Sequence, residues 1–159
     1  MTKIVKSAKI ENLISRLKAS KKSIILTGGC FDILHIGHIK FLKEAKKNGD
    51  ILMVLLESDE KVKLVKGNNR PYFHQGERAE VLDALQMIDY VILLPPKMID
   101  QDYDQLIMTI KPNMIAVTAS DPILNKKKRQ AELVGGKIIV IPFIKTFSSS
   151  RLAKFLGVE

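Results

Sequence analysis

The stretch Gly28–His38, which reads GGCFDILHIGH, decides the fold and follows the short apolar run from Ser23 to Thr27. An apolar run that is rich in β-branched residues and ends in glycines predicts a buried strand. Residues 37–48 continue with the apolar spacing of a helix that ends at an Asn-Gly pair. His35 and His38 stand three residues apart at the start of this helix, so we expect their side chains to share one side of it.

This helix start has the features of a phosphate-binding site. Glycine backbone lets a ligand approach closely, and Gly37 leaves room between the two imidazole groups. The helix N-terminus adds N–H donors and the positive end of the helix dipole. A metal site is the alternative for two nearby histidines, but it needs a third ligand, and His74 could join only through the fold. We therefore predict a phosphate site and no metal site.

The rest of the chain alternates between strand and helix patterns. Strands are expected over 23–27, 51–56, 90–94, 114–117 and 137–141, and helices over 9–20, 37–48, 76–86, 103–110, 125–134 and 149–156. Five apolar strands separated by amphipathic helices predict an α/β fold, a Rossmann-like doubly wound five-stranded parallel sheet. We expect one domain over residues 1–159, in which residues 1–22 form an N-terminal helix that leads into the first strand.

The topology also predicts where a ligand binds. In doubly wound sheets ligands lie beyond the carboxyl ends of the strands, at the point where the strand order reverses. The segments that follow strands are Gly28–His38, residues 118–121, residues 142–150 and the stretch 59–75, which is the longest expected loop. Thr118, Ser120 and residues 143–147 are candidates for contact with a ligand bound there.

Composition excludes several classes of protein. Of 159 residues 46% are hydrophobic and 27% charged, which is typical of a folded chain and not of a disordered or collagen-like one. No apolar run approaches the roughly 18 residues of a membrane span, and residues 1–6 lack the apolar stretch of a secretory signal. The single cysteine, Cys30, excludes an internal disulfide. We expect a cytoplasmic protein without a membrane partner.

The charge balance indicates an anionic partner. Lys and Arg number 26 against 17 Asp and Glu, a formal net charge of +9, which favours nucleic acid, acidic membranes or phosphorylated small molecules. Aromatic residues make up only 6% and Trp is absent, which is unlike a protein that stacks single-stranded bases. Basic residues are scattered except at residues 126–129, which we interpret as a solvated helix face. We therefore expect a phosphorylated small molecule and no nucleic acid.

The stretch also resembles a family signature. Its G-x-F-D-x-x-H-x-G-H form is similar to that of the nucleotidyltransferase superfamily, in its cytidylyltransferase-like branch; the matching residues are Gly29, Phe31, Asp32, His35, Gly37 and His38. Ser58-Asp59, the run Lys66–Pro71, Arg78 and residues 82–85 resemble the adenylyltransferase domain of bacterial ADP-heptose synthase. The resemblance covers nearly the whole chain.

The resemblance implies an enzyme and its site. Such enzymes transfer a nucleotidyl group from a nucleoside triphosphate to a phosphorylated alcohol or sugar, release pyrophosphate, use Mg²⁺ and are expected to be homodimers. The implied catalytic residues are His35, His38 and Lys66, with Lys66 at the α-phosphate and Lys63 as the alternative lysine. The implied nucleotide-binding residues are Gly29, Cys30, Phe31, Gly37, Arg78, Ser148, Ser149 and Ser150.

Several of these residues also have a structural interpretation. Arg70 and Arg78 could hold phosphates in bidentate fashion. Arg78 could instead pair with Glu77 or Glu80, and Arg70 could only shape its loop. Asp32 is expected to orient the loop through backbone hydrogen bonds. The three serines of residues 148–150 are at least a helix cap and could also bind the triphosphate.

Two loops depart from the family pattern and leave the substrate open. Residues 118–122 lack the glycines and the aromatic residue of the heptose-type enzymes, and residues 145–147 lack a glutamate-glycine pair. ATP with a sugar 1-phosphate is the preferred substrate pair, on the stronger local match. The alternatives are CTP with glycerol 3-phosphate or a similar alcohol phosphate, and ATP with flavin mononucleotide. A nucleotide-binding scaffold without activity is the alternative outside enzymes.

Overall fold

The sheet of the computed structural model, which describes residues 3–142 and 148–157, is six-stranded and parallel. Its order is β1-β4-β3-β2-β5-β6, with β1 Ile4–Lys6, β2 Ile24–Gly29, β3 Ile51–Leu56, β4 Tyr90–Leu93, β5 Met114–Thr118 and β6 Lys137–Ile141. The predicted α/β class and doubly wound parallel sheet are confirmed, but the count of five strands is wrong. The extra strand β1 pairs with the edge of β4. With three residues, it is too short to show an apolar period.

Helices connect the strands as predicted, with one addition. They are α1 Ile10–Ala19, α2 Ile36–Lys46, α3 Asp59–Lys66, α4 Gln75–Asp83, α5 Asp100–Ile110, α6 Leu124–Leu133 and α7 Ser149–Phe155, and a 3-10 turn at Ser7–Lys9 precedes α1. Residues 1–22 are therefore not helical from their start. Helix α3 occupies half of the predicted 59–75 loop.

The sequence does contain the signals of helix α3. The Ser58 side chain accepts a hydrogen bond from the Lys61 backbone N–H, and acidic residues fill the first turn, where they complement the helix dipole. Gly67 ends the helix at φ 106°, which favours glycine. Only Val62 of this helix is buried. Because α3 lacks an apolar period, its sequence does not show the amphipathic pattern by which the other helices are predicted.

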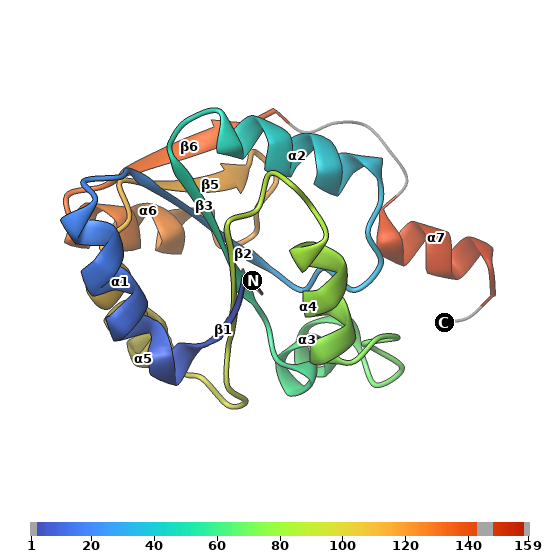
Figure 1. The fold of residues 1–159 in the computed structure, drawn as a ribbon. Coiled ribbons are helices and arrows are strands. Elements are labelled where there is room, and N and C mark those ends of the chain that lie inside the picture. Colours follow the sequence, from blue (N-terminus) through green and yellow to red (C-terminus); the bar gives the residue numbers. More distant parts are fainter. Residues whose placement is uncertain (1–2, 143–147, 158–159) are drawn as a thin grey trace.

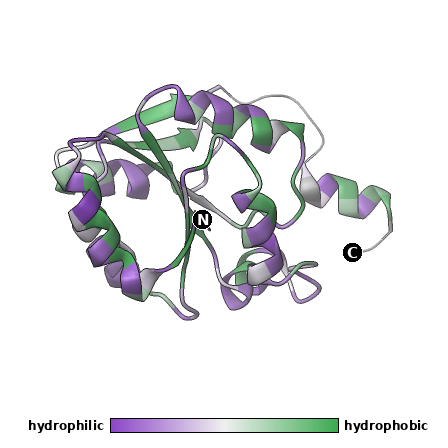
Figure 2. Ribbon diagram, in the orientation of Figure 1, coloured by the Kyte–Doolittle hydropathy of each residue, from purple (hydrophilic) through white to green (hydrophobic). Residues whose placement is uncertain are grey.

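The helices cover both faces of the sheet (Figure 1). On one face α1, α5 and α6 pack against strand residues such as Leu26 and Met53, and on the other α2 and α4 pack against Ile25 and Leu52. Strand β3 is buried along its whole length, as expected for a central parallel strand. Figure 2 shows the strands as mostly hydrophobic and the helices as two-sided. Within the described residues, no helix is both long and apolar enough to cross a bilayer.

The order of the strands reverses at β2, and there the sheet opens. β2 pairs with β3 as far as Gly29 and Leu56, but its register with β5 consists of Ile25–Met114 and Leu26–Ile115. Beyond these pairs the Thr27 hydroxyl donates to the Ala116 carbonyl at 3.1 Å. The ends of β2 and β5 thus separate at the switch point, where doubly wound sheets bind their ligands.

Candidate active site

A cavity of about 320 Å³ opens at this separation. It gathers most of the residues that the sequence implicates: Gly29, Cys30, Phe31, His35, Gly37, His38, Lys66, Ser148 and Ser150. Residues from the ends of β2 and β5 complete its wall. We call it the first cavity. One loop, the ends of three helices and the ends of two strands thus supply a set of groups that lie far apart in the sequence.

The two histidines fix each other at the N-terminus of α2. The His35 Nδ1 accepts a hydrogen bond from the Gly37 backbone N–H at 3.1 Å, and the His38 Nδ1 accepts one from the His35 backbone N–H at 3.3 Å. The ring centroids are 3.9 Å apart. A neutral imidazole that accepts at Nδ1 carries its proton on Nε2. Both Nε2–H groups are therefore available as donors to a ligand.

The surroundings keep both imidazoles neutral. Burial lowers the pKa of His38 to about 4, with further contributions from His35 and from the positive charge of Lys66. Burial and Lys66 also lower the pKa of His35. Bound phosphate would reverse the effect of Lys66, because an anion stabilises a nearby positive charge. In the free protein near neutral pH, the site offers two neutral N–H donors and one ammonium group.

Lys66 is the last residue of α3 and lies on the cavity wall. The expectation that it sits within a long loop is wrong. Its effect on the pKa values of His35, His38 and Cys30 places its charge close to all three groups. Lys63, the alternative lysine, is exposed and lines neither of the cavities described here. The geometry thus favours Lys66 over Lys63 as a phosphate ligand.

The glycine loop, residues 28–32, passes between the histidines and the end of β3. A Cβ on Gly29 would lie 3.0 Å from the Phe31 ring, so the ring leaves little room for a side chain. Phe31 itself adopts φ 45°, which is uncommon for a residue other than glycine. Its ring is 7% exposed and lies 5.5 Å from the His38 ring. Burial raises the pKa of the Cys30 thiol against the charge of Lys66, which does not suit a nucleophile.

Asp32 holds this loop through the contacts that were expected of it. Its carboxylate accepts hydrogen bonds from the backbone N–H groups of Tyr72 and Phe73 at 3.0 to 3.1 Å. It also forms an ion pair of 2.6 Å with the Arg70 Nε, and both side chains are at most 1% exposed. The prediction for Asp32 is confirmed, and Arg70 shapes the loop.

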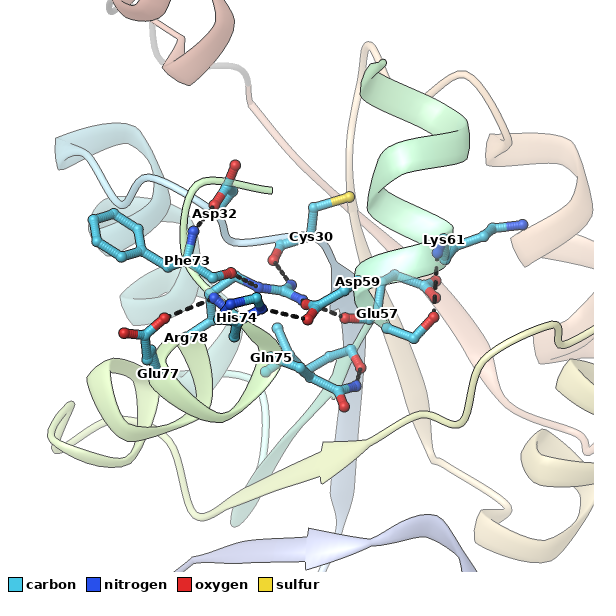
Figure 3. Close-up of polar contacts among 12 residues, drawn as sticks. Cys30, Asp32, Glu57, Asp59, Lys61, Phe73, His74, Gln75, Glu77 and Arg78 are labelled. Carbon is cyan, nitrogen blue, oxygen red and sulfur yellow. Dashed lines mark hydrogen bonds and ion pairs between the residues drawn. The ribbon is translucent and has the colours of Figure 1, made fainter. Parts of the chain in front are cut away.

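Arg78 lies behind the loop and not in the cavity (Figure 3). Its guanidinium donates to the backbone carbonyls of Cys30, Phe73 and Glu57 and to the Asp59 carboxylate at 2.7 Å. The side chain is fully buried. The alternative pairing with Glu77 or Glu80 is wrong, because Asp59 is the acidic partner. As placed here, Arg78 supports the glycine loop and does not reach a phosphate in the cavity.

The serines at the start of α7 were predicted both as a cap and as phosphate ligands. The Ser148 side chain accepts from the Arg151 backbone N–H at 3.2 Å, which confirms the cap. Ser148 and Ser150 line the first cavity. The described part of the chain does not include the Ser149 side chain. It also does not include residues 143–147, which are predicted to contact the ligand.

A second cavity of about 410 Å³ lies on the other side of the glycine loop. It shares Thr27, Gly28, Gly29, Cys30, Asp121 and Lys127 with the first cavity. Its wall is largely aliphatic, with side chains such as Leu55 and Ile107. Among its polar residues is Glu57, which accepts a hydrogen bond from the Tyr103 hydroxyl at 2.8 Å. Burial raises the pKa of Glu57, although the Tyr103 hydrogen bond opposes the shift.

The comparisons with known proteins agree with this geometry. The cytidylyltransferase-like family matches residues 26–153. This chain belongs to the cytidylyltransferase-like family. It is 39% identical over 154 residues to the bifunctional protein HldE of Geobacter metallireducens and 34% identical over 146 residues to that of Desulfatibacillum aliphaticivorans, matches that cover 91% and 90% of this chain. The chain spans only 30% and 29% of the length of these relatives.

Solved structures of this nucleotidyltransferase fold lie close in shape. The lipopolysaccharide core biosynthesis protein of Thermoplasma volcanium is 26% identical, with a TM-score of 0.63, and covers 79% of this chain and 99% of its own. The pantoate-beta-alanine ligase of Francisella tularensis is 17% identical, with a TM-score of 0.64 over 92% of this chain and 69% of its own, which shows the fold alone. This member of the cytidylyltransferase-like family thus shares the nucleotidyltransferase-type fold of these solved structures.

Three residues of this nucleotidyltransferase were missed by the sequence analysis. Glu57 directly follows the fully apolar β3, a position that borders the switch point and could have been found. Tyr103 is the fourth residue of α5 and carries no sequence signal of its own. The sequence predicts that Lys127 lies on a solvated helix face, but its side chain is only 17% exposed and lines both cavities.

Proposed function

We propose that the protein transfers an adenylyl group from ATP to the phosphate of a small acceptor such as a sugar 1-phosphate, with release of pyrophosphate. The observation that carries this proposal is the convergence of His35, His38 and Lys66 on one wall of the first cavity. Two neutral N–H donors and an ammonium group match the oxygens of a triphosphate. The histidines can donate because their Nδ1 atoms are already occupied by backbone N–H groups.

The proposed transfer needs no covalent intermediate with the enzyme. The acceptor phosphate oxygen is ionised and attacks the α-phosphorus of ATP, and the bond from that phosphorus to the pyrophosphate oxygen breaks. Charge develops on the α-phosphate oxygens and on the leaving pyrophosphate, where fixed donors stabilise it. Lys66 would serve the α-phosphate, and the histidines would serve the phosphates that leave. Rate enhancement then comes from alignment and electrostatics.

Mg²⁺ is proposed to enter as part of the substrate MgATP. Among residues 3–142 and 148–157, no three His, Cys, Asp or Glu side chains are grouped so that they could hold a metal ion. Mg²⁺ commonly keeps several waters and binds through substrate phosphates in nucleotide sites. The residues present therefore fit an ion carried by the triphosphate and not one held by a protein cage.

The second cavity is the proposed place for the acceptor. It meets the first cavity along Thr27 and the glycine loop, so an acceptor there would lie beside a nucleotide's α-phosphate. Lys61 and Lys126 lie near its mouth, 5.6 and 5.4 Å from the Tyr103 ring centroid. Aliphatic walls with Glu57 as a buried acceptor suit a compact molecule that carries hydroxyl groups as well as phosphate.

The central experiment is a pyrophosphate-release screen with ATP or CTP and a panel of sugar 1-phosphates, glycerol 3-phosphate and flavin mononucleotide. We expect release with ATP and one acceptor class, and none from the His35→Ala/His38→Ala double variant. His74→Ala is the matched control, since His74 is exposed and lines neither cavity. Release that survives in the double variant contradicts the proposed site.

The choice of base has its own test. ATP is proposed over CTP because the glycine loop and residues 66–71 match the heptose-type adenylyltransferases. Calorimetric titration of the magnesium-free protein with both nucleotides should show tighter ATP binding. Clearly tighter CTP binding would overturn adenylyl transfer and leave nucleotidyl transfer intact. No binding of either nucleotide would favour a scaffold that has lost activity, which the altered residues 118–122 make the second candidate.

A further inference from the structure

Lys127 occupies a position that the nucleotidyltransferase signature does not explain. It lies in the second turn of α6, and its side chain reaches the wall that the two cavities share. Of the neighbouring basic residues, Lys126 lines only the second cavity, and Lys128 lines neither. Lys127 is therefore the member of this basic run that can contact ligands in both cavities.

Asp121 fixes the Lys127 side chain in this position. The Asp121 Oδ2 accepts a hydrogen bond from the Lys127 Nζ at 2.7 Å, and the Oδ1 accepts from the Ile123 backbone N–H at 2.9 Å. The Asp121 backbone N–H donates to the Thr118 carbonyl at the end of β5. The two paired side chains are 13% and 17% exposed. The ammonium group is thus held by a carboxylate that is itself anchored to the strand end.

This arrangement leaves the ammonium group able to bind an anion. An ammonium group has three N–H donors, and Asp121 takes one of them in the contacts of residues 3–142 and 148–157. The charge of Lys127 also acts inside the second cavity, because it is among the charges that lower the pKa of Glu57. A partly buried cation attracts an incoming phosphate more strongly than an exposed one does.

We propose that Lys127 is a further catalytic residue that binds the acceptor phosphate at the junction of the two cavities, and that Asp121 positions it. This inference rests on the proposed function. With the acceptor body in the second cavity, its phosphate would sit at the shared wall, next to the α-phosphorus in the first. Lys127 would hold the attacking oxygen in line while Lys66 stabilises the charge that develops on the α-phosphate. The lysine transfers no group in this step.

The kinetic experiment uses Lys127→Met with Lys128→Met as the matched control on the same helix. With ATP and the acceptor found by the screen, Lys127→Met should lower kcat/KM for the acceptor roughly ten- to hundredfold, the effect of one charge-assisted hydrogen bond. The ATP Kd should change less than about threefold. Lys127→Arg should restore part of the loss, and Asp121→Asn should reproduce part of it. Unchanged kcat/KM in Lys127→Met overturns the proposal, and an equal loss of ATP affinity assigns Lys127 to the nucleotide instead.

A binding experiment tests the residue without turnover. The probe is inorganic phosphate, titrated into the protein saturated with a non-hydrolysable ATP analogue. Wild type and Lys128→Met should bind phosphate equally, and Lys127→Met at least tenfold more weakly. Equal affinity in all three proteins, or no phosphate binding by wild type, contradicts the proposal. Wild type that releases no pyrophosphate with any acceptor contradicts the proposed function instead, and the phosphate titration then still decides the role of Lys127.

Discussion

His35, His38 and Lys66 face the first cavity, whereas Arg70 and Arg78 lie behind the same glycine loop. Both groups consist of basic residue types, and all five residues follow the loop in the sequence. The arginine side chains are at most 1% exposed. Arg70 donates to Asp32, and Arg78 donates to Asp59 and to backbone carbonyls. In each histidine the Nδ1 atom accepts a hydrogen bond from the protein backbone, and the Nε2–H group is available to a ligand.

The basic residues around the glycine loop thus have two roles: the arginines stabilise its backbone, and the histidines and Lys66 face the ligand. A buried guanidinium with four acceptors rigidifies the backbone that carries the glycine loop. Each of the two imidazoles at the start of α2 is held by one backbone N–H group and still presents a donor. Substitutions behind the loop should therefore change stability first, and substitutions in front of it should change rate first.

The largest effect is expected from Arg78→Met. The change leaves the carbonyls of Cys30, Phe73 and Glu57 and the carboxylate of Asp59 without this partner. Because the Asp59 carboxylate is 34% exposed, the loss should come mainly from the carbonyls, at about 1–3 kcal/mol for each acceptor left buried and unpaired. Urea unfolding should show that loss of stability, while Arg16→Met, on an exposed position of α1, should leave the midpoint unchanged. A loss below about 1 kcal/mol would mean that Arg78 is not the support of the loop.

The fold was largely predictable because its strands are apolar runs of ordinary length. Strand β1 and helix α3 were missed for physical reasons: one is three residues long, and the other buries a single residue and is fixed by its cap. The motif residues of the first cavity are local in sequence, so spacing alone brings His35 and His38 together.

The rest of the site could not be predicted, because it depends on tertiary structure. Arg78 and Lys66 are both basic residues that follow the glycine loop in the sequence, and only packing decides which of them is buried. Tyr103 and Glu57 are 46 positions apart and meet across the switch point. Lys127 faces the cavities because Asp121 holds it there, while Lys128 beside it points to solvent.

The second largest effect is expected on rate, in His35→Ala and His38→Ala. Loss of one preorganised donor typically costs on the order of 10²–10³ in turnover. Steady-state pyrophosphate release measures the loss, and urea unfolding of the same variants should show much smaller changes than Arg78→Met. Turnover at the wild-type level in either variant would show that the substituted histidine is not a catalytic residue. If the histidine variants lost as much stability as Arg78→Met, the histidines would act as structural supports of the loop like Arg78, and the proposed difference between the two sides of the loop would be wrong.

The pH dependence of stability sharpens the same contrast. His38 has a pKa of about 4 in the folded protein against 6.5 for a free imidazole, so the unfolded chain binds more protons in this window. The contribution of His38 is complete above pH 6.5 and falls by up to about 3 kcal/mol as the pH drops to 4. Unfolding curves of wild type and His38→Gln at several pH values give the difference. Parallel pH profiles for the two proteins would show that His38 is not held neutral.

The smallest effect is expected from Lys66→Met, and it separates binding from catalysis within the cavity group. If Lys66 acts on the charge that develops at the α-phosphate, kcat should fall roughly tenfold or more while the KM for ATP rises less. Lys63→Met, on the exposed side of the same helix, should leave both constants unchanged. An increase in KM alone would make Lys66 an anchor for the ground state. An effect of Lys63 in place of Lys66 would contradict the placement of the cavity wall, because only Lys66 of this pair lines it.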